Sequence, residues 1–148
     1  MVRTVVRGVA LCVMTLVYFT GTAVAESDVD SIQHLLHSAF DKPDAELIVE
    51  PIVVASDHAI AGWTQGDMGG RALLRRKGGE WAIILCSGDA LKSVDALVKA
   101  AVPEGAAATL EQKLVKAEAS LDPRRVAHSR FEGFVMMDET GHHPPQQK

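Results

Sequence analysis

Residues 58–87, HAIAGWTQGDMGGRALLRRKGGEWAIILCS, contain three strand-like runs separated by two glycine-rich turns. The runs span residues 58–65, 71–76 and 81–86, and the turns span residues 66–70 and 77–79. Turns this short join antiparallel neighbours, so the segment predicts a β-meander. The last run is almost entirely apolar, which is typical of a central strand.

A further strand is predicted before this segment, in residues 47–54 (LIVEPIVV). Pro51 interrupts the run and has no backbone N–H to donate to a neighbouring strand. Proline inside a sheet is found at edges and bulges. We therefore expect this strand at the edge of the sheet.

Helical periodicity appears on both sides of the predicted sheet. Residues 27–40 repeat apolar side chains at helical spacing, with Ser27 or Asp28 placed to cap the first turn. Two more helices are predicted at residues 91–101 and 106–121, and Ser87 or Asp89 is placed to cap the first of them. The dipeptide Asp122-Pro123 is typical of the start of a third helix. The predicted fold class is α+β: an N-terminal helix, a four-strand antiparallel meander, and two or three C-terminal helices packed on one sheet face. Residues 131–137 fit either a loop or a last short strand.

The first 25 residues have the pattern of a secretory signal peptide. Arg3 and Arg7 precede an apolar run at 9–19, and small residues lead to an A-x-A site that ends at Ala25. The apolar run is shorter than the roughly 20 residues that span a bilayer. The sequence predicts an exported chain without a membrane anchor after cleavage, a single domain at residues 26–137 and a disordered tail at residues 138–148.

Composition excludes several classes of function. Without residues 1–25 the chain carries 13 basic and 19 acidic residues, a net charge of −6, which is unlike a nucleic-acid-binding protein. Cys86 is then the single cysteine, so no intrachain disulfide can form and burial of its thiol is expected. Nucleophile-elbow and zinc-protease signatures are absent from the sequence, and we predict that the protein is not an enzyme.

Two groups of residues are candidate copper ligands. The first choice is Met136, Met137, His142 and His143, because thioethers suit Cu(I) and imidazoles suit copper in either oxidation state. The same residues also fit a strand end followed by a solvated tail. A weaker pair is His34 and His37, which share one polar face of the first predicted helix with Asp30 and Asp41. That face also fits simple hydration.

Strand ends provide two further candidates. His58, Met68 and Cys86 lie at or near predicted strand ends and would form a third metal site if those ends coincide. Arg71, Arg75 and Arg76 would bind an anion or an acidic partner at the sheet edge, although charged strand residues also serve to protect an edge from aggregation.

The string G-W-T-Q-G-D-x-G-G-R-A-L-L-R-R-K, within residues 57–77, resembles the small exported bacterial family of copper uptake system-associated proteins. The similarity continues through E-W-A-I-I-L-C-S-G-D-A-L at 80–91 and includes residues 41–44, 131–133 and 135–137. The resemblance implies a periplasmic accessory of copper import in Gram-negative bacteria, whose partner is a copper transporter or a soluble copper carrier. It implies no catalytic residues and no metal ligands.

Two functions remain open at this point. The first is a periplasmic accessory protein that binds copper through methionine and histidine and hands it to a transporter or carrier. The alternative is a protein-interaction module that binds no metal and regulates a copper transport system through contacts at Arg71, Arg75 and Arg76.

Overall fold

The computed structural model describes residues 23–136 of the chain, and their elements follow a simple order. They are α1 (Ala23–Phe40), β1 (Leu47–Ala55), β2 (His58–Gln65), β3 (Met68–Lys77), β4 (Glu80–Ser87), the short 3₁₀ helix η1 (Asp89–Lys92), α2 (Val94–Lys99), α3 (Glu104–Glu118), α4 (Pro123–Ala127) and β5 (Phe134–Met136). The α+β class is therefore confirmed.

The strands form one antiparallel sheet in the order β1-β2-β3-β4-β5. The predicted meander is correct, but the sheet has five strands where four were expected. The additional strand, β5, pairs with β4 through Cys86 and Val135 and their neighbours. Three residues are too few for the alternating pattern of a strand to stand out in the sequence.

Strand β1 lies at the sheet edge, as Pro51 predicted, and its pairing with β2 shifts between Val49 and Ile52. The shift changes which side chains face which helix layer. Val49 packs in the cluster under α1, and Ile52 packs against that same cluster although it lies three positions further along. Val53, between Ile52 and Val54, packs toward the opposite face.

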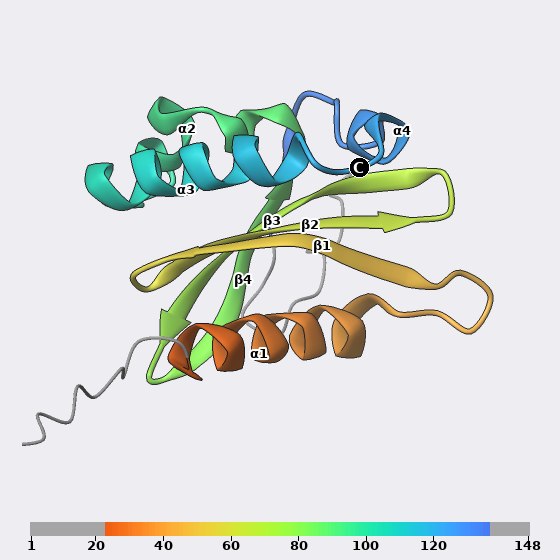
Figure 1. Cartoon of the computed structure of the whole chain (residues 1–148), viewed down its shortest axis with the longest axis horizontal. Helices are drawn as coiled ribbons and strands as arrows, with labels where there is room; N and C mark the ends of the chain where they lie inside the picture. The colour runs from red at the N-terminus through yellow and green to blue at the C-terminus, as the bar shows by residue number, and fades with distance from the viewer. Residues whose placement is uncertain (1–22, 137–148) are drawn as a thin grey trace, which may run out of the picture.

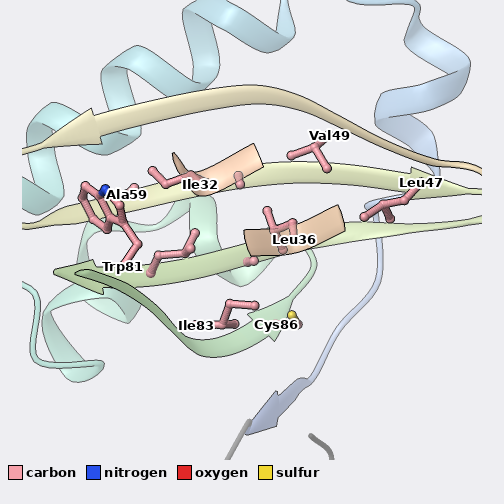
Figure 2. Close-up of a cluster of buried hydrophobic side chains, with 11 residues drawn as sticks. Ile32, Leu36, Leu47, Val49, Ala59, Trp81, Ile83 and Cys86 are labelled. Carbon is pink, nitrogen blue, oxygen red and sulfur yellow. The ribbon is translucent and has the colours of Figure 1, made fainter. Parts of the chain in front are cut away.

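Helices cover both faces of the sheet, so the molecule has three layers (Figure 1). From α1, Ile32 and Leu36 are fully buried against a cluster that includes Trp81, Ile83 and Cys86 (Figure 2). On the opposite face, Leu97 of α2 and the pair Leu110 and Leu114 of α3 pack against β1, β2 and β3. The C-terminal helices therefore share one sheet face as predicted, and α1 covers the other.

Helix boundaries differ from the prediction at several places: α3, expected at 106–121, spans Glu104–Glu118, and neither Ser87 nor Asp89 caps η1, whose N-cap is Gly88. The helix expected at 91–101 is divided into η1 and α2, because the Ser93 hydroxyl accepts a hydrogen bond from the Ala96 N–H (3.4 Å) and starts a new helix there. Helix α1 begins at Ala23, so Ser27 and Asp28 lie inside it and do not cap it. The cap of α4 is confirmed, since Asp122 accepts from the Arg124 N–H at 2.9 Å ahead of Pro123.

The β2–β3 hairpin turns earlier than the glycines suggest. Gln65 pairs with Met68, so Gly66 and Asp67 alone form the turn, and Gly66 takes the left-handed φ of +59°. Gly69 and Gly70 belong to β3, where other groups lie very close to the backbone. A Cβ at Gly70 would come within 2.9 Å of the Trp63 ring, and one at Gly69 within 2.7 Å of the His128 Cβ.

Candidate functional site

A cavity lies where the hairpin extends beyond strand β4. Arg71 pairs with Ser87 at the last position of the β3–β4 ladder, so residues 68–70 reach past the end of β4. The chain after α4 crosses this end of the sheet and brings His128 against Gly69. The space between the hairpin, the end of α1 and this crossing segment has a volume of about 580 Å³. Its apolar lining comes from Phe40, Leu47, Trp63, Phe131 and Val135.

Three soft-ligand side chains line this cavity: Met68, Cys86 and His128. Met68 is 58% exposed and His128 is also exposed, whereas Cys86 is only 8% exposed. The thioether and the imidazole therefore lie at the cavity mouth, and the thiol lies in its floor.

The orientation of the His128 ring is set by the turn of the hairpin. Nδ1 of His128 lies 2.9 Å from the carbonyl oxygen of Asp67. Because a carbonyl oxygen can only accept, Nδ1 must carry the proton. In the neutral ring Nε2 then presents its lone pair. A backbone carbonyl that holds one ring nitrogen in this way is the usual support of a metal-ligating histidine.

Met68 lies between the two residues that His128 contacts. The His128 ring contacts the Asp67 carbonyl, and the His128 Cβ lies against Gly69. Side chains alternate along a strand, so Met68 points to the face of β3 opposite to the one that His128 approaches at Gly69, and both side chains line the same cavity at the hairpin end. A thioether and an imidazole are both suitable ligands for Cu(I).

Cys86 contributes a protonated thiol. Burial raises its pKa to about 11. Cys86 pairs with Ala72, four residues along β3 from Met68, which corresponds to roughly 13 Å at the usual rise of a strand. Met68 and Cys86 thus share a cavity without sharing a coordination sphere. The expectation of a buried thiol is confirmed, and Figure 2 shows its sulfur at the edge of the apolar cluster.

The third predicted metal site does not include His58, because His58 lies far from Met68. His58 pairs with Arg75 at the opposite end of β2, seven residues from Gln65, and lies about 23 Å from the hairpin turn at the usual strand rise. Of the three strand-end residues, the fold brings only Met68 and Cys86 to one cavity. Antiparallel pairing places the first residue of β2 at the far end from the first residue of β3.

The predicted partner-binding role of Arg71 is also wrong, because this side chain is fully buried. Its Nε and Nη2 donate to the Glu118 carboxylate at 2.6 and 3.0 Å, and Nη1 donates to the Ser129 carbonyl at 3.1 Å. Burial by itself raises the pKa of Glu118, but hydrogen bonds and charges from Arg71 and Lys92 outweigh it and lower the pKa. Position 71 faces α3 from a central strand, so it holds the fold together and offers no surface.

The other two arginines do not form a common patch. Arg75 is exposed. Arg76 is half-buried, stacks at 4.5 Å over the Trp81 ring and pairs with Asp28 at 2.6 Å. A role of Arg75 and Arg76 in partner binding remains a prediction.

Of the first-choice copper ligands, Met136 is the one that lies in the described part of the chain. Met136 is 49% exposed and lines a second cavity, of about 560 Å³, on the sheet face covered by α2. Its neighbour Val135 lines the cavity of Cys86, so the two side chains point to opposite faces. Three of the predicted ligands lie outside the described residues, namely Met137, His142 and His143. The same holds for the tail at 138–148 and for residues 1–22 of the predicted signal peptide.

The weaker pair on α1 lies on its outer face. His34 is exposed, and His37 is half-buried with Nδ1 3.4 Å from the Asp41 carboxylate. Asp41 is engaged elsewhere too, since its carboxylate accepts from the Leu47 N–H at 3.1 Å. That hydrogen bond is the main reason why the pKa of Asp41 is lowered, followed by the contacts with His37 and Lys42. His34 and His37 stay a predicted two-ligand site.

Sequence reasoning missed His128. One signal was available: two consecutive glycines in a strand often mark a place where another segment approaches closely. Gly69 and Gly70 carry that signal, but the sequence does not say which segment approaches.

Two findings on residues 23–136 complete the description of the site. No three His, Cys, Asp or Glu side chains of this part converge on a point that could hold a metal ion. No helix in the described range is both long and apolar enough to cross a membrane.

Comparison of the chain with protein-family models, curated proteins and solved structures found no match.

Proposed function

We propose that the protein is an exported accessory of copper uptake that binds Cu(I) at the cavity mouth through Met68 and His128. The observation that carries this proposal is the hydrogen bond from His128 Nδ1 to the Asp67 carbonyl (2.9 Å), because it leaves the Nε2 lone pair available to a metal ion at a cavity that Met68 also lines. The resemblance described above supplies the biological setting, a transporter or carrier that receives the ion.

The chemistry of the two side chains suits Cu(I). Thioether sulfur is a soft donor that favours Cu(I) over the harder cations, and imidazole accepts Cu(I) as well. Neither side chain must lose a proton to bind when the histidine is neutral. The free thiol of Cys86 is less suited, because its proton is held with a pKa of about 11 and must leave before the sulfur ligates strongly.

Exposure of Met68 and His128 favours transfer of the ion. Met68 is more than half exposed, and His128 also faces solvent. Ligands of a partner protein can therefore approach the ion while it is still held, and the ion can move by stepwise exchange of ligands. A site enclosed by the fold would require partial opening first.

A Cu(I) competition titration against a chromophoric chelator tests this proposal. Met68→Leu and His128→Gln each keep the size of the side chain and remove one donor, and each should weaken Cu(I) binding at least about ten-fold, which corresponds to about 1.4 kcal/mol. Met136→Leu is the matched methionine control and His34→Gln the matched histidine control. Both controls should bind as the unmodified protein does.

Two outcomes contradict the proposal. If alanine at Met136, Met137, His142 and His143 abolishes binding while Met68→Leu and His128→Gln do not, copper binds at the C-terminal residues. If the unmodified protein does not compete for Cu(I) at all, the copper-binding function is wrong and the interaction module without metal becomes the better description.

A further inference from the structure

The outer edge of β1 forms the floor of a groove between the two helix layers. β1 is the first strand of the sheet order, and its outer edge faces no other strand of the described chain. In Figure 1 β1 crosses between α3 and α1. The space beside it has a volume of about 720 Å³ and is lined by Val29 of α1, by Ile52, Val53 and Val54 of β1, and by Lys113 and Lys116 of α3.

Backbone groups of β1 point into this groove. The Lys113 ammonium donates to the Val54 carbonyl at 2.7 Å, so this carbonyl points away from β2. In an antiparallel strand the N–H and C=O of one residue point to the same side, and the direction alternates from residue to residue. The N–H and C=O of Ile52 and the N–H of Val54 therefore point outward as well, as an added strand requires.

The two sides of the groove differ in chemistry. Ile52 and Val54 are half-buried and pack toward α1, so that side is apolar. On the other side Lys113 and Lys116 are exposed, three residues apart on α3. Residues at this spacing lie about 5–6 Å apart on a helix surface. Alternate residues of an extended strand lie about 6.6–6.8 Å apart, which is close to the spacing of the two lysines.

Asp28 does not neutralise these lysines. Its carboxylate pairs with Arg76 at 2.6 Å and lies 3.4 Å from the Trp81 Nε1, on the α1 side of the groove. The α3 side consequently keeps a positive charge next to a strand edge that pairs with no other strand of residues 23–136.

We propose that this groove binds an extended acidic segment of a partner protein by β-strand addition. The segment pairs with the outward backbone groups of Ile52 and Val54, and its N–H replaces the Lys113 ammonium on the Val54 carbonyl. Carboxylates at alternate positions pair with Lys113 and Lys116, and the intervening apolar side chains lie over Ile52 and Val54. Main-chain hydrogen bonds supply the affinity and the alternating side chains supply the specificity.

The test uses a labelled peptide, acetyl-Thr-Glu-Val-Glu-Thr-Glu-Val-amide, and its counterpart with lysine in place of glutamate. Both peptides are titrated into the protein while its amide NMR signals are followed. The glutamate peptide should shift the Ile52 and Val54 amides and slow their hydrogen exchange, with binding that weakens as salt is raised. The lysine peptide should bind at least about ten-fold more weakly.

Charge variants locate the contact. The double variant Lys113→Glu, Lys116→Glu should weaken binding of the glutamate peptide at least about ten-fold. Lys99 is an exposed lysine on α2, and Lys99→Glu should leave the binding of this peptide unchanged. Circular dichroism of each variant shows whether it has folded. Equal binding of both peptides, shifts confined to residues outside the groove, or a concentration-dependent dimer that protects Ile52 and Val54 without peptide would each overturn the proposal. Because no copper is present, the result is independent of the Cu(I) site.

Discussion

The two ends of the β2–β3 pair present histidines in opposite settings. At one end His58 is 7% exposed, and its Nε2 has no hydrogen-bond partner in the described structure. Burial first, and then the positive charge of Arg75, lowers the pKa of His58. At the other end His128 is exposed, and its Nδ1 is held by the Asp67 carbonyl. The setting of His58 therefore disfavours a positive charge, whereas His128 is open to solvent and held in one orientation.

The two ends also differ in how firmly they are closed. Near His58, Arg76 joins α1 to the sheet through its ion pair with Asp28 and stacks over Trp81. At the hairpin end, residues 68–70 extend beyond β4 and leave a cavity. Arg71 lies where β3 leaves β4 and anchors that point to α3. The buried ion pair of Arg71 with Glu118 therefore holds the strand next to the open cavity.

The largest expected effect comes from removing that anchor. Arg71→Ala leaves the Glu118 carboxylate buried with Lys92 as its remaining cation, and should lower the free energy of unfolding by about 3–5 kcal/mol. Arg75→Ala, on the same strand but exposed, should change it by less than about 0.5 kcal/mol. Urea unfolding of both variants measures the two values. Equal losses would show that burial of Arg71 does not govern its contribution.

The next effect concerns the two sulfur side chains of the cavity. With a pKa of about 11, roughly one Cys86 thiol in a thousand is ionised at pH 8, against about one in four for an ordinary cysteine. Alkylation of native Cys86 by iodoacetamide should therefore be about 250-fold slower than in urea, whereas hydrogen peroxide should oxidise exposed Met68 readily. Mass spectrometry of peptides follows both reactions. Rapid alkylation in the native state would place the thiol at the cavity mouth.

A smaller effect tests how His128 is held against β3. Gly69→Ala places a Cβ about 2.7 Å from the His128 Cβ, so the crossing segment must move. We expect a loss of about 1–3 kcal/mol in stability and weaker Cu(I) binding. Gly105→Ala in α3 is the control, because a Cβ there meets nothing within 4 Å, and helix propensity favours alanine by up to about 1 kcal/mol. An unaffected Cu(I) affinity in Gly69→Ala would separate His128 from the site.

The smallest effect sharpens the contrast between the histidines through pH. The pKa of His58 is lowered in the folded protein, so the unfolded chain takes up a proton first as the pH falls. Stability should therefore be fully present above about pH 6.5 and decline as the pH falls below that value, toward the lowered folded pKa. His58→Leu should flatten this decline, and His128→Gln should leave it unchanged. Urea titrations between pH 5 and 8 measure both; a decline that persists in His58→Leu would assign it to another group.

Much of the fold follows from local patterns in the sequence. The alternation and short turns of residues 58–87 predict the meander, Pro51 predicts the edge position of β1, and Asp122-Pro123 predicts the start of α4. These features depend on near neighbours in the chain. Strand β5 depends on a partner almost fifty residues away, so the sequence of residues 131–137 left a loop and a short strand equally open, and the pairing with β4 decides for the strand.

The candidate site was less predictable because it depends on contacts between distant residues. Met68 and Cys86 were recognised as soft donors, but His128, which directly follows α4, lines the same cavity only because the chain folds back onto the hairpin. Arg71 looks like Arg75 in the sequence, and only the buried Glu118, 47 residues further along, makes it an internal ion pair. Charge on a strand does not reveal which face is buried until the opposite layer is known.

The most direct test of the Cu(I) site is an NMR measurement of the histidine ring nitrogens in ¹⁵N-labelled protein. Before copper is added, His128 should be the tautomer with the proton on Nδ1, as its hydrogen bond to the Asp67 carbonyl requires. One equivalent of Cu(I) should shift Nε2 of His128 and the methyl signal of Met68, and leave His58 unchanged. A His128 ring that carries its neutral proton on Nε2, or that does not respond while other histidines do, would contradict the proposed site.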